Sequence, residues 1–157
     1  MHSNAALIET FYRAFQRRDA EAMAACYTSD VRFSDPAFGE LVGSAATDMW
    51  RMLCSRAKDL QLRFSDVAAD DARGSARWEA DYLFSQTGRM VHNRIDASFK
   101  FRDGLIAEHR DTFDLWRWSR QALGLPGILL GWSPIVRNKV RSQALRGLEA
   151  FRAAKPR

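Results

Sequence analysis

The sequence predicts a single α+β domain, in which a curved, mixed or antiparallel sheet carries N-terminal helices on its concave face and a helical extension follows. Three observations predict this class. Segments with helical apolar spacing come first, strand-like segments with alternating side chains come second, and the 157 residues suit one domain with a sizeable core. Helices followed by an antiparallel meander are typical of α+β proteins. Where the sheet curves away from the helices, we expect a cavity.

Three N-terminal segments have helical spacing. Residues 4–17 repeat apolar side chains every three or four positions, and Asp19 can cap a short second helix over 20–27. Residues 43–58 return to the helical period, and a short strand over 31–34 ends at Asp35-Pro36.

Four strands are expected next, at 60–68, 75–85, 91–102 and 105–115, with turns at 86–89 and 103–104. Period-2 alternation fixes which side chains share a face. On the last two strands the odd-numbered side chains face inward, and these are Val91, Asn93, Ile95, Ala97, Phe99, Phe101, Ala107, His109, Asp111, Phe113 and Leu115.

The net charge of +5 is unevenly distributed along the chain. Residues 117–157 carry nine Lys or Arg against the single acid Glu149, which gives +8, whereas residues 1–116 sum to −3. No apolar run is long enough to span a bilayer, and Met1 to Leu7 does not read as a signal peptide. Cys26 and Cys54 lack metal-site spacing and are expected to be reduced, in a cytoplasmic protein.

The tail beyond residue 116 is expected to form a basic, amphipathic helical extension of a core domain over 1–116. A short helix at 116–124, an apolar stretch at 125–132 and a long helix at 136–153 make up this tail. A lid over the cavity or a subunit contact is favoured over an anionic membrane surface. Nucleic acid is not expected as a partner, because the body is acidic.

Two short segments resemble enzymes of the nuclear transport factor 2-like superfamily. Residues 30–36, Asp-Val-Arg-Phe-Ser-Asp-Pro, resemble the ketosteroid isomerase segment whose Asp before Pro is the general base. Residues 104–114 resemble the last strand of limonene epoxide hydrolase and of SnoaL-type polyketide cyclases. The resemblance spans about residues 4–116 and implies a cone-shaped fold with a small-molecule pocket. It also implies acid–base roles for Asp35 and Asp111.

Other catalytic positions depart from these families. Phe11 takes the place of the isomerase's oxyanion Tyr, with Tyr12 one residue away, and Ala97 takes the place of its protonated Asp. The Arg-x-Asp pair of the epoxide hydrolase is also missing in register.

The predicted catalytic residues are therefore Asp35, Asp111 and His109, whose imidazole could exchange a proton with a carboxyl group near neutral pH. Asn93 could donate to a substrate oxygen. An apolar wall for the ligand is expected from Trp50, Trp78, Tyr82, Phe99 and Phe113.

The predicted function is the binding of a small, mainly apolar metabolite, with isomerase, cyclase or hydrolase chemistry. The alternative is a non-catalytic ligand-binding or accessory dimeric module, in which the same pocket holds a hydrophobic ligand without chemistry and the tail engages a partner. A third interpretation is a structural dimer whose cavity is filled by its own side chains. Neither a metal nor a cofactor is expected, since the three His residues do not cluster and no phosphate-binding loop is present. Alternating charges on the outer sheet face, among them Arg94, Asp96, Lys100 and Glu108, suggest a homodimer.

Overall fold

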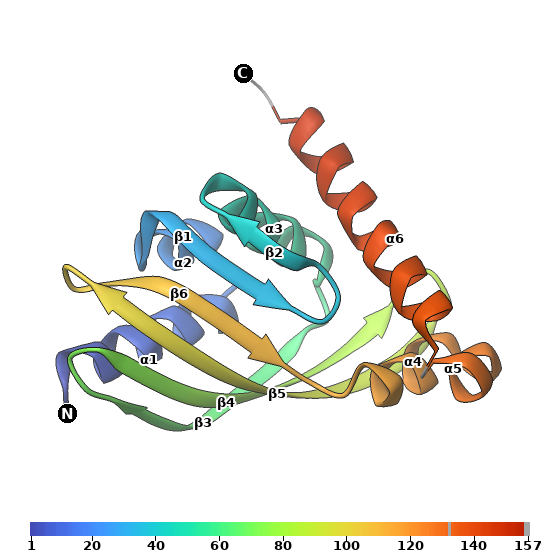
Figure 1. Cartoon of the computed structure of the whole chain (residues 1–157), viewed down its shortest axis with the longest axis horizontal. Helices are drawn as coiled ribbons and strands as arrows, with labels where there is room; N and C mark the ends of the chain where they lie inside the picture. The colour runs from blue at the N-terminus through green and yellow to red at the C-terminus, as the bar shows by residue number, and fades with distance from the viewer. Residues whose placement is uncertain (132, 156–157) are drawn as a thin grey trace.

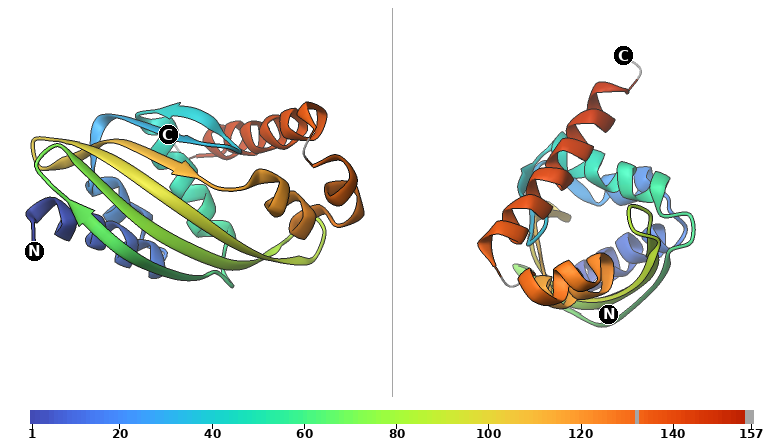
Figure 2. Two further views of the ribbon diagram at one scale, coloured as in Figure 1. Left: turned by 60° about the horizontal axis from the view of Figure 1, so that its bottom comes forward. Right: turned by 90° about the vertical axis from the view of Figure 1, so that its right-hand side faces the viewer.

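The structure is a computed structural model that describes residues 1–131 and 133–155, and it contains a six-stranded sheet curved around helices (Figures 1 and 2). The predicted α+β class is confirmed. The helices are α1 (Ser3–Gln16), α2 (Ala20–Ala25), α3 (Ser44–Arg56), α4 (Leu115–Leu123), α5 (Leu125–Leu130) and α6 (Pro134–Ala153). The strands are β1 (Tyr27–Asp35), β2 (Gly39–Val42), β3 (Gln61–Ala69), β4 (Arg73–Phe84), β5 (Arg89–Arg102) and β6 (Leu105–Thr112).

The strands lie in the order β2-β1-β6-β5-β4-β3. All neighbours are antiparallel except β1 and β6, which run parallel. This parallel pair joins the N-terminal part of the chain to the end of the meander. The four-residue strand β2 was not predicted, because it is too short to show alternation.

The end of the meander differs from the prediction in two ways. A bulge between β5 and β6 places Ile106 opposite Phe101, so Ile106 is fully buried and Ala107 is not. The expected inward position of Ala107 is therefore wrong, whereas His109 and Asp111 are buried as expected. The strand also ends at Thr112 instead of residue 115, because the Asp114 side chain accepts the Arg117 N–H and caps α4.

Aromatic side chains fill the space between the helices and the sheet. Phe11, Tyr12 and Phe15 from α1 meet Trp50 from α3, and all four are at most 2% exposed. Their rings pack mostly edge to face, as in the Phe11–Trp50 pair with centroids 5.6 Å apart. This core fills one part of the concave side and leaves the rest to a cavity.

The C-terminal extension closes around that remaining part. Helix α4 packs on β5 and α6 packs on α3, so the extension covers the side of the sheet that α1 to α3 leave open (Figure 2). The predicted apolar stretch over 125–132 contains the short helix α5, and residue 132 lies outside the described residues.

Candidate active site

A cavity of about 340 Å³ lies between the sheet, α3 and the C-terminal helices. Its lining is mostly apolar and aromatic, as in pockets for small organic molecules. The sheet contributes Asp35, Trp78, Ala80, Tyr82, Asn93, Ile95 and Asp111 to it. The helices contribute Met49, Trp50, Leu53, Trp118, Val140 and Ala144, among others.

Two carboxyl groups line this cavity side by side. Strands β1 and β6 pair with Ser34 opposite Arg110, so the next residues along the two strands are Asp35 and Asp111. Alternation turns both side chains to the concave face, where Val31 and Phe33 are also buried. Neighbouring parallel strands lie about 4.8 Å apart, so two like charges are close in a poorly solvated site.

The Asp35 carboxyl group is held by the turn that follows it. Its Oδ1 accepts the backbone N–H groups of Ala37 at 2.9 Å and Phe38 at 2.6 Å. Burial raises the pKa of Asp35 to about 7, and the charge of Asp111 adds to the rise, although the hydrogen bonds from Phe38 and Ala37 and the cation of Arg141 oppose it. One carboxylate oxygen is thus fixed in place, and the group can exchange a proton near neutral pH.

Asp111 ends a chain of buried hydrogen bonds. Its Oδ1 lies 2.8 Å from His109 Nε2 and accepts the Trp78 indole N–H at 3.4 Å. His109 Nδ1 lies 2.7 Å from the Tyr27 hydroxyl, which accepts the Trp50 indole N–H at 2.9 Å. The Tyr27 hydroxyl accepts the indole N–H, so its own proton is available for His109 Nδ1, and we assign the His109 tautomer whose Nε2–H donates to Asp111. This chain of hydrogen bonds fixes the position of the Asp111 carboxyl group.

The Tyr82 hydroxyl also lines the cavity and accepts the Trp118 indole N–H at 2.7 Å. Burial raises its pKa, so the hydroxyl keeps its proton at neutral pH. Among the described residues no acceptor takes that proton, so it is available to a ligand. The sequence suggested only an apolar role for this residue.

The predicted site residues separate into two groups in the structure. Those that line the cavity are Asp35, Asp111, Asn93, Trp50, Trp78, Tyr82 and Phe113. His109 lies behind the cavity, 1% exposed, and reaches it only through Asp111. Phe99 was expected in the wall of the ligand cavity, but its ring packs on His109 with the ring centroids 4.5 Å apart. Phe99 is not among the described residues that line the cavity.

A model of the SnoaL-like domain matches residues 8–109 of the sequence. The chain belongs to the SnoaL-like family. A search of curated proteins finds no significant match.

Solved structures share the fold of this SnoaL-like chain. A proposed polyketide cyclase from Xanthomonas campestris pv. campestris is 23% identical, with a TM-score of 0.64 over 76% of this chain and 96% of that one. An LEH-like epoxide hydrolase from M. tuberculosis is 20% identical, with a TM-score of 0.66 over 81% and 95%. A hypothetical protein from Catenulispora acidiphila with a ketosteroid isomerase-like fold, in complex with trimethylamine, is 13% identical, with a TM-score of 0.67 over 82% and 97%.

The family match ends before α6, yet α6 forms one wall of the cavity through Val140, Gln143, Ala144 and Gly147. Sequence reasoning left the place of this helix open. The apolar stripe at Val140 and Ala144 was visible in the sequence, but nothing there specified which surface it covers.

A buried carboxylate fixes α6 against α3. Asp48 of α3, 3% exposed in its side chain, pairs with Arg152 at 3.0 Å, with Arg51 at 2.9 Å and with Lys155. Burial alone would raise the pKa of Asp48, but the hydrogen bonds from Lys155 and Arg51 outweigh it and hold the pKa below its usual value.

We expect Asp48→Asn to lower the free energy of unfolding by about 2 kcal/mol at neutral pH, because it removes charge-assisted hydrogen bonds from a buried site. The folded pKa is lowered, so this contribution is present above the unfolded pKa near 4 and is lost as the pH falls through the folded value. Urea unfolding at several pH values checks this, with Glu149→Gln on the exposed side of α6 as the control. Equal stability of both variants at pH 7 would contradict the role of Asp48 in holding α6 against α3.

Among the residues that the structure describes, no three His, Cys, Asp or Glu side chains gather as ligands for a metal ion.

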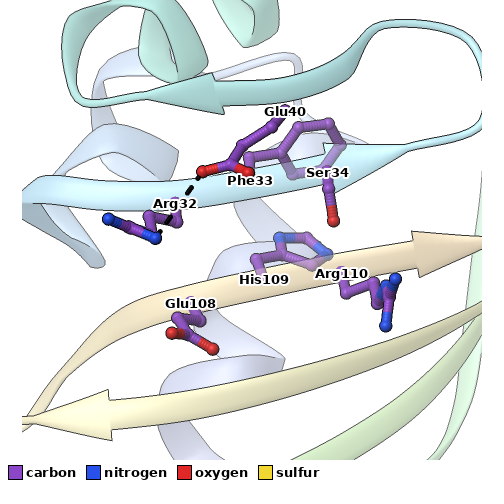
Figure 3. Close-up of a pocket in the computed structure, with 7 residues that line it drawn as sticks. All are labelled: Arg32, Phe33, Ser34, Glu40, Glu108, His109 and Arg110. Atoms are coloured by element: carbon purple, nitrogen blue, oxygen red, sulfur yellow. Dashed lines mark ion pairs between the residues drawn. The ribbon is translucent and has the colours of Figure 1, made fainter.

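A second hollow of about 200 Å³ lies on the outer sheet face between β1 and β6 (Figure 3). Arg32 of β1 and Glu40 of β2 pair on one side of it at 3.8 Å, and Glu108 and Arg110 of β6 line the other side. Its two acids and two arginines balance one another, whereas the inner cavity places two carboxyl groups on a mostly apolar lining.

Proposed function

We propose that this SnoaL-like chain binds a small, mainly apolar metabolite in the inner cavity and transfers a proton on it through Asp35. The observation that carries the proposal is the pair of carboxyl groups, Asp35 and Asp111, on one apolar cavity, with the pKa of Asp35 near 7. A group that titrates near the working pH is suited to both accept and release a proton.

The other polar groups are assigned roles from their places on the cavity and, where they have them, from their hydrogen bonds. Asp35 acts as the base that takes up the proton and returns it. Asp111, positioned by His109, faces it as a fixed carboxylate whose charge raises the pKa of Asp35. The Tyr82 hydroxyl and the Asn93 amide supply donors for a ligand oxygen, in place of the oxyanion donors of the isomerases. A carbonyl- or epoxide-bearing substrate would use all of these groups, as in isomerisation, cyclisation or hydration.

A ligand-binding module without chemistry is the second candidate. It is favoured by the positions of Phe11 and Ala97, which are both buried in the core and supply no donor to the cavity. Ligand binding without any product, for a series of compounds that stabilise the fold, would support this candidate over the enzyme.

Filling the cavity tests the binding step on which both candidates depend. We expect Ala144→Trp to weaken binding of the neutral fluorescent probe N-phenyl-1-naphthylamine by at least about tenfold, because the indole would occupy the apolar space between α6 and the sheet. Ala150→Trp on the exposed side of α6 is the matched control and should bind the probe like the wild type. Unchanged binding by Ala144→Trp would remove the inner cavity as the ligand site.

A homodimer through the outer sheet face also remains our proposal, as does a cytoplasmic location. The face is rich in complementary charges, with pairs such as Arg77–Asp96 at 2.9 Å and Lys100–Glu108 at 3.3 Å. Both thiols, Cys26 and Cys54, are free and buried, which suits a reducing compartment. Light scattering should give twice the chain mass, and the mass of a single chain would exclude the dimer.

A further inference from the structure

The short helix α5 packs with its apolar face outward. Its glycines face α4: a Cβ on Gly127 would lie 1.9 Å from the Ser119 carbonyl oxygen, and a Cβ on Gly131, just after the helix, would lie 2.9 Å from the Trp116 ring. The opposite side carries Leu125, Ile128 and Leu129, spaced as neighbours on one helix face. A surface helix of a water-soluble domain normally buries its large apolar side chains and exposes its small ones.

Exposed apolar side chains therefore gather at this end of the molecule. We call the group the apolar tip, and it comprises Trp116 at 38% exposure, Leu125 at 66%, Ile128 at 49%, Leu129 at 59% and Ile135 at 78%. The Trp116 indole N–H donates to the Ile128 carbonyl at 3.4 Å, which joins α4 to α5 in one surface. Most of the large exposed apolar side chains of the described residues belong to this group.

Basic side chains, here called the basic rim, lie on α4 and α6, the helices that flank α5 in the chain. Arg120 stacks over the Trp116 ring at 4.4 Å, and Arg117, Arg137 and Lys139 are exposed on α4 and the first turns of α6. They belong to the segment 117–157, whose net charge is +8, whereas residues 1–116 carry −3. Apolar side chains with a tryptophan at the rim and a ring of Arg and Lys are suited to the boundary between lipid headgroups and acyl chains.

We propose that the apolar tip docks on an anionic lipid surface, with its apolar side chains among the acyl chains and its basic rim on the headgroups. Charge selects this occupant over a second copy of the chain, because two copies of the basic rim repel each other whereas an anionic leaflet attracts each one. No described helix is long and apolar enough to cross a membrane.

Docking at this place would bring the cavity close to the lipid. The neighbours of α5 in the chain, α4 and α6, both contribute cavity walls, through Trp118 and Leu123 and through Val140 and Ala144. A ligand dissolved in the bilayer could then enter with little exposure to water. This consequence rests on the proposed function, but the docking itself does not.

Flotation with vesicles tests the docking. The wild-type chain should float with equimolar phosphatidylcholine–phosphatidylglycerol vesicles, fail to float with pure phosphatidylcholine, and be released by added salt. Leu125→Ser with Ile135→Ser should weaken binding by at least about tenfold, because two apolar anchors are lost. Val42→Ser, an exposed apolar side chain on β2, is the matched control.

The charged rim is tested separately. Arg137→Glu with Lys139→Glu should weaken binding by at least about tenfold, whereas Arg73→Glu with Arg110→Glu, on the sheet, should have a much smaller effect.

Failure of the wild type to float at low salt, or equal flotation of all variants, would overturn the proposal. A dimer that dissociates in Leu125→Ser with Ile135→Ser, without vesicle binding by the wild type, would assign the tip to a second copy. Probe binding in the cavity, measured without vesicles, reports on the proposed function independently.

Discussion

Tyr27→Phe is expected to lower the free energy of unfolding by about 2–4 kcal/mol. The Tyr27 hydroxyl accepts the Trp50 indole N–H and donates to His109 Nδ1, and all three groups are buried. Removing it leaves a buried donor and a buried acceptor without partners, at the full cost of their lost solvation. Urea unfolding monitored by tryptophan fluorescence measures the change.

Tyr12→Phe is the matched control, because it removes the same atom from the same core. The Tyr12 hydroxyl is buried and, within the described residues, has no hydrogen-bond partner. Its removal should leave the stability unchanged or raise it by about 1 kcal/mol, since a buried, unpaired hydroxyl group is itself unfavourable. Similar losses in both variants would show that the cost does not come from the chain of hydrogen bonds between Trp50 and Asp111.

Asp35→Asn is expected to reduce turnover by about a hundredfold to ten-thousandfold, because an amide cannot accept the proton that the mechanism moves. The amide oxygen can still accept the N–H groups of Ala37 and Phe38, so the turn should remain in place. The rate is measured on any apolar epoxide or unsaturated ketone that the wild type converts. An unchanged rate would remove Asp35 from the chemistry while leaving the cavity as a binding site.

The same variant should be more stable than the wild type at alkaline pH, by roughly 2–4 kcal/mol at pH 8. The folded pKa of Asp35 is raised to about 7, so the wild type loses stability as the pH rises from the unfolded value near 4 through 7, while the neutral amide does not. Below pH 4 the two proteins should have equal stability. Unfolding curves across this pH range check the sign, and a destabilised variant at pH 8 would contradict the raised pKa.

Alternation along β5 and β6 was sufficient to predict the faces that form the site. His109, Asp111 and Asn93 were placed correctly relative to the sheet, because a one-residue slip would have exposed a row of apolar side chains to water. The bulge at Ala107 was not visible, since it depends on how two strands pair and not on the sequence of either one.

The depth of each residue within the cone could not be predicted from one strand at a time. His109 and Phe99 lie opposite each other on neighbouring strands, where α1 packs on the sheet, so they belong to the core. Tyr27 was expected at the end of a helix, yet it begins β1 and connects Trp50 to His109. The packing of α6 on α3 could not be predicted either, because Asp48 and Arg152 are far apart in the sequence and meet only in the folded structure.

The central claim is that Asp35 titrates near neutral pH beside Asp111 in an apolar cavity, and carboxyl ¹³C NMR measures this directly. The Asp35 signal is identified as the one absent from Asp35→Asn, and its midpoint should lie at about 7 in the wild type. In Asp111→Asn the midpoint should fall, because the neighbouring negative charge is gone. A midpoint near 4, the ordinary value for an aspartate, with no response to Asp111→Asn, would contradict the proposed acid–base site.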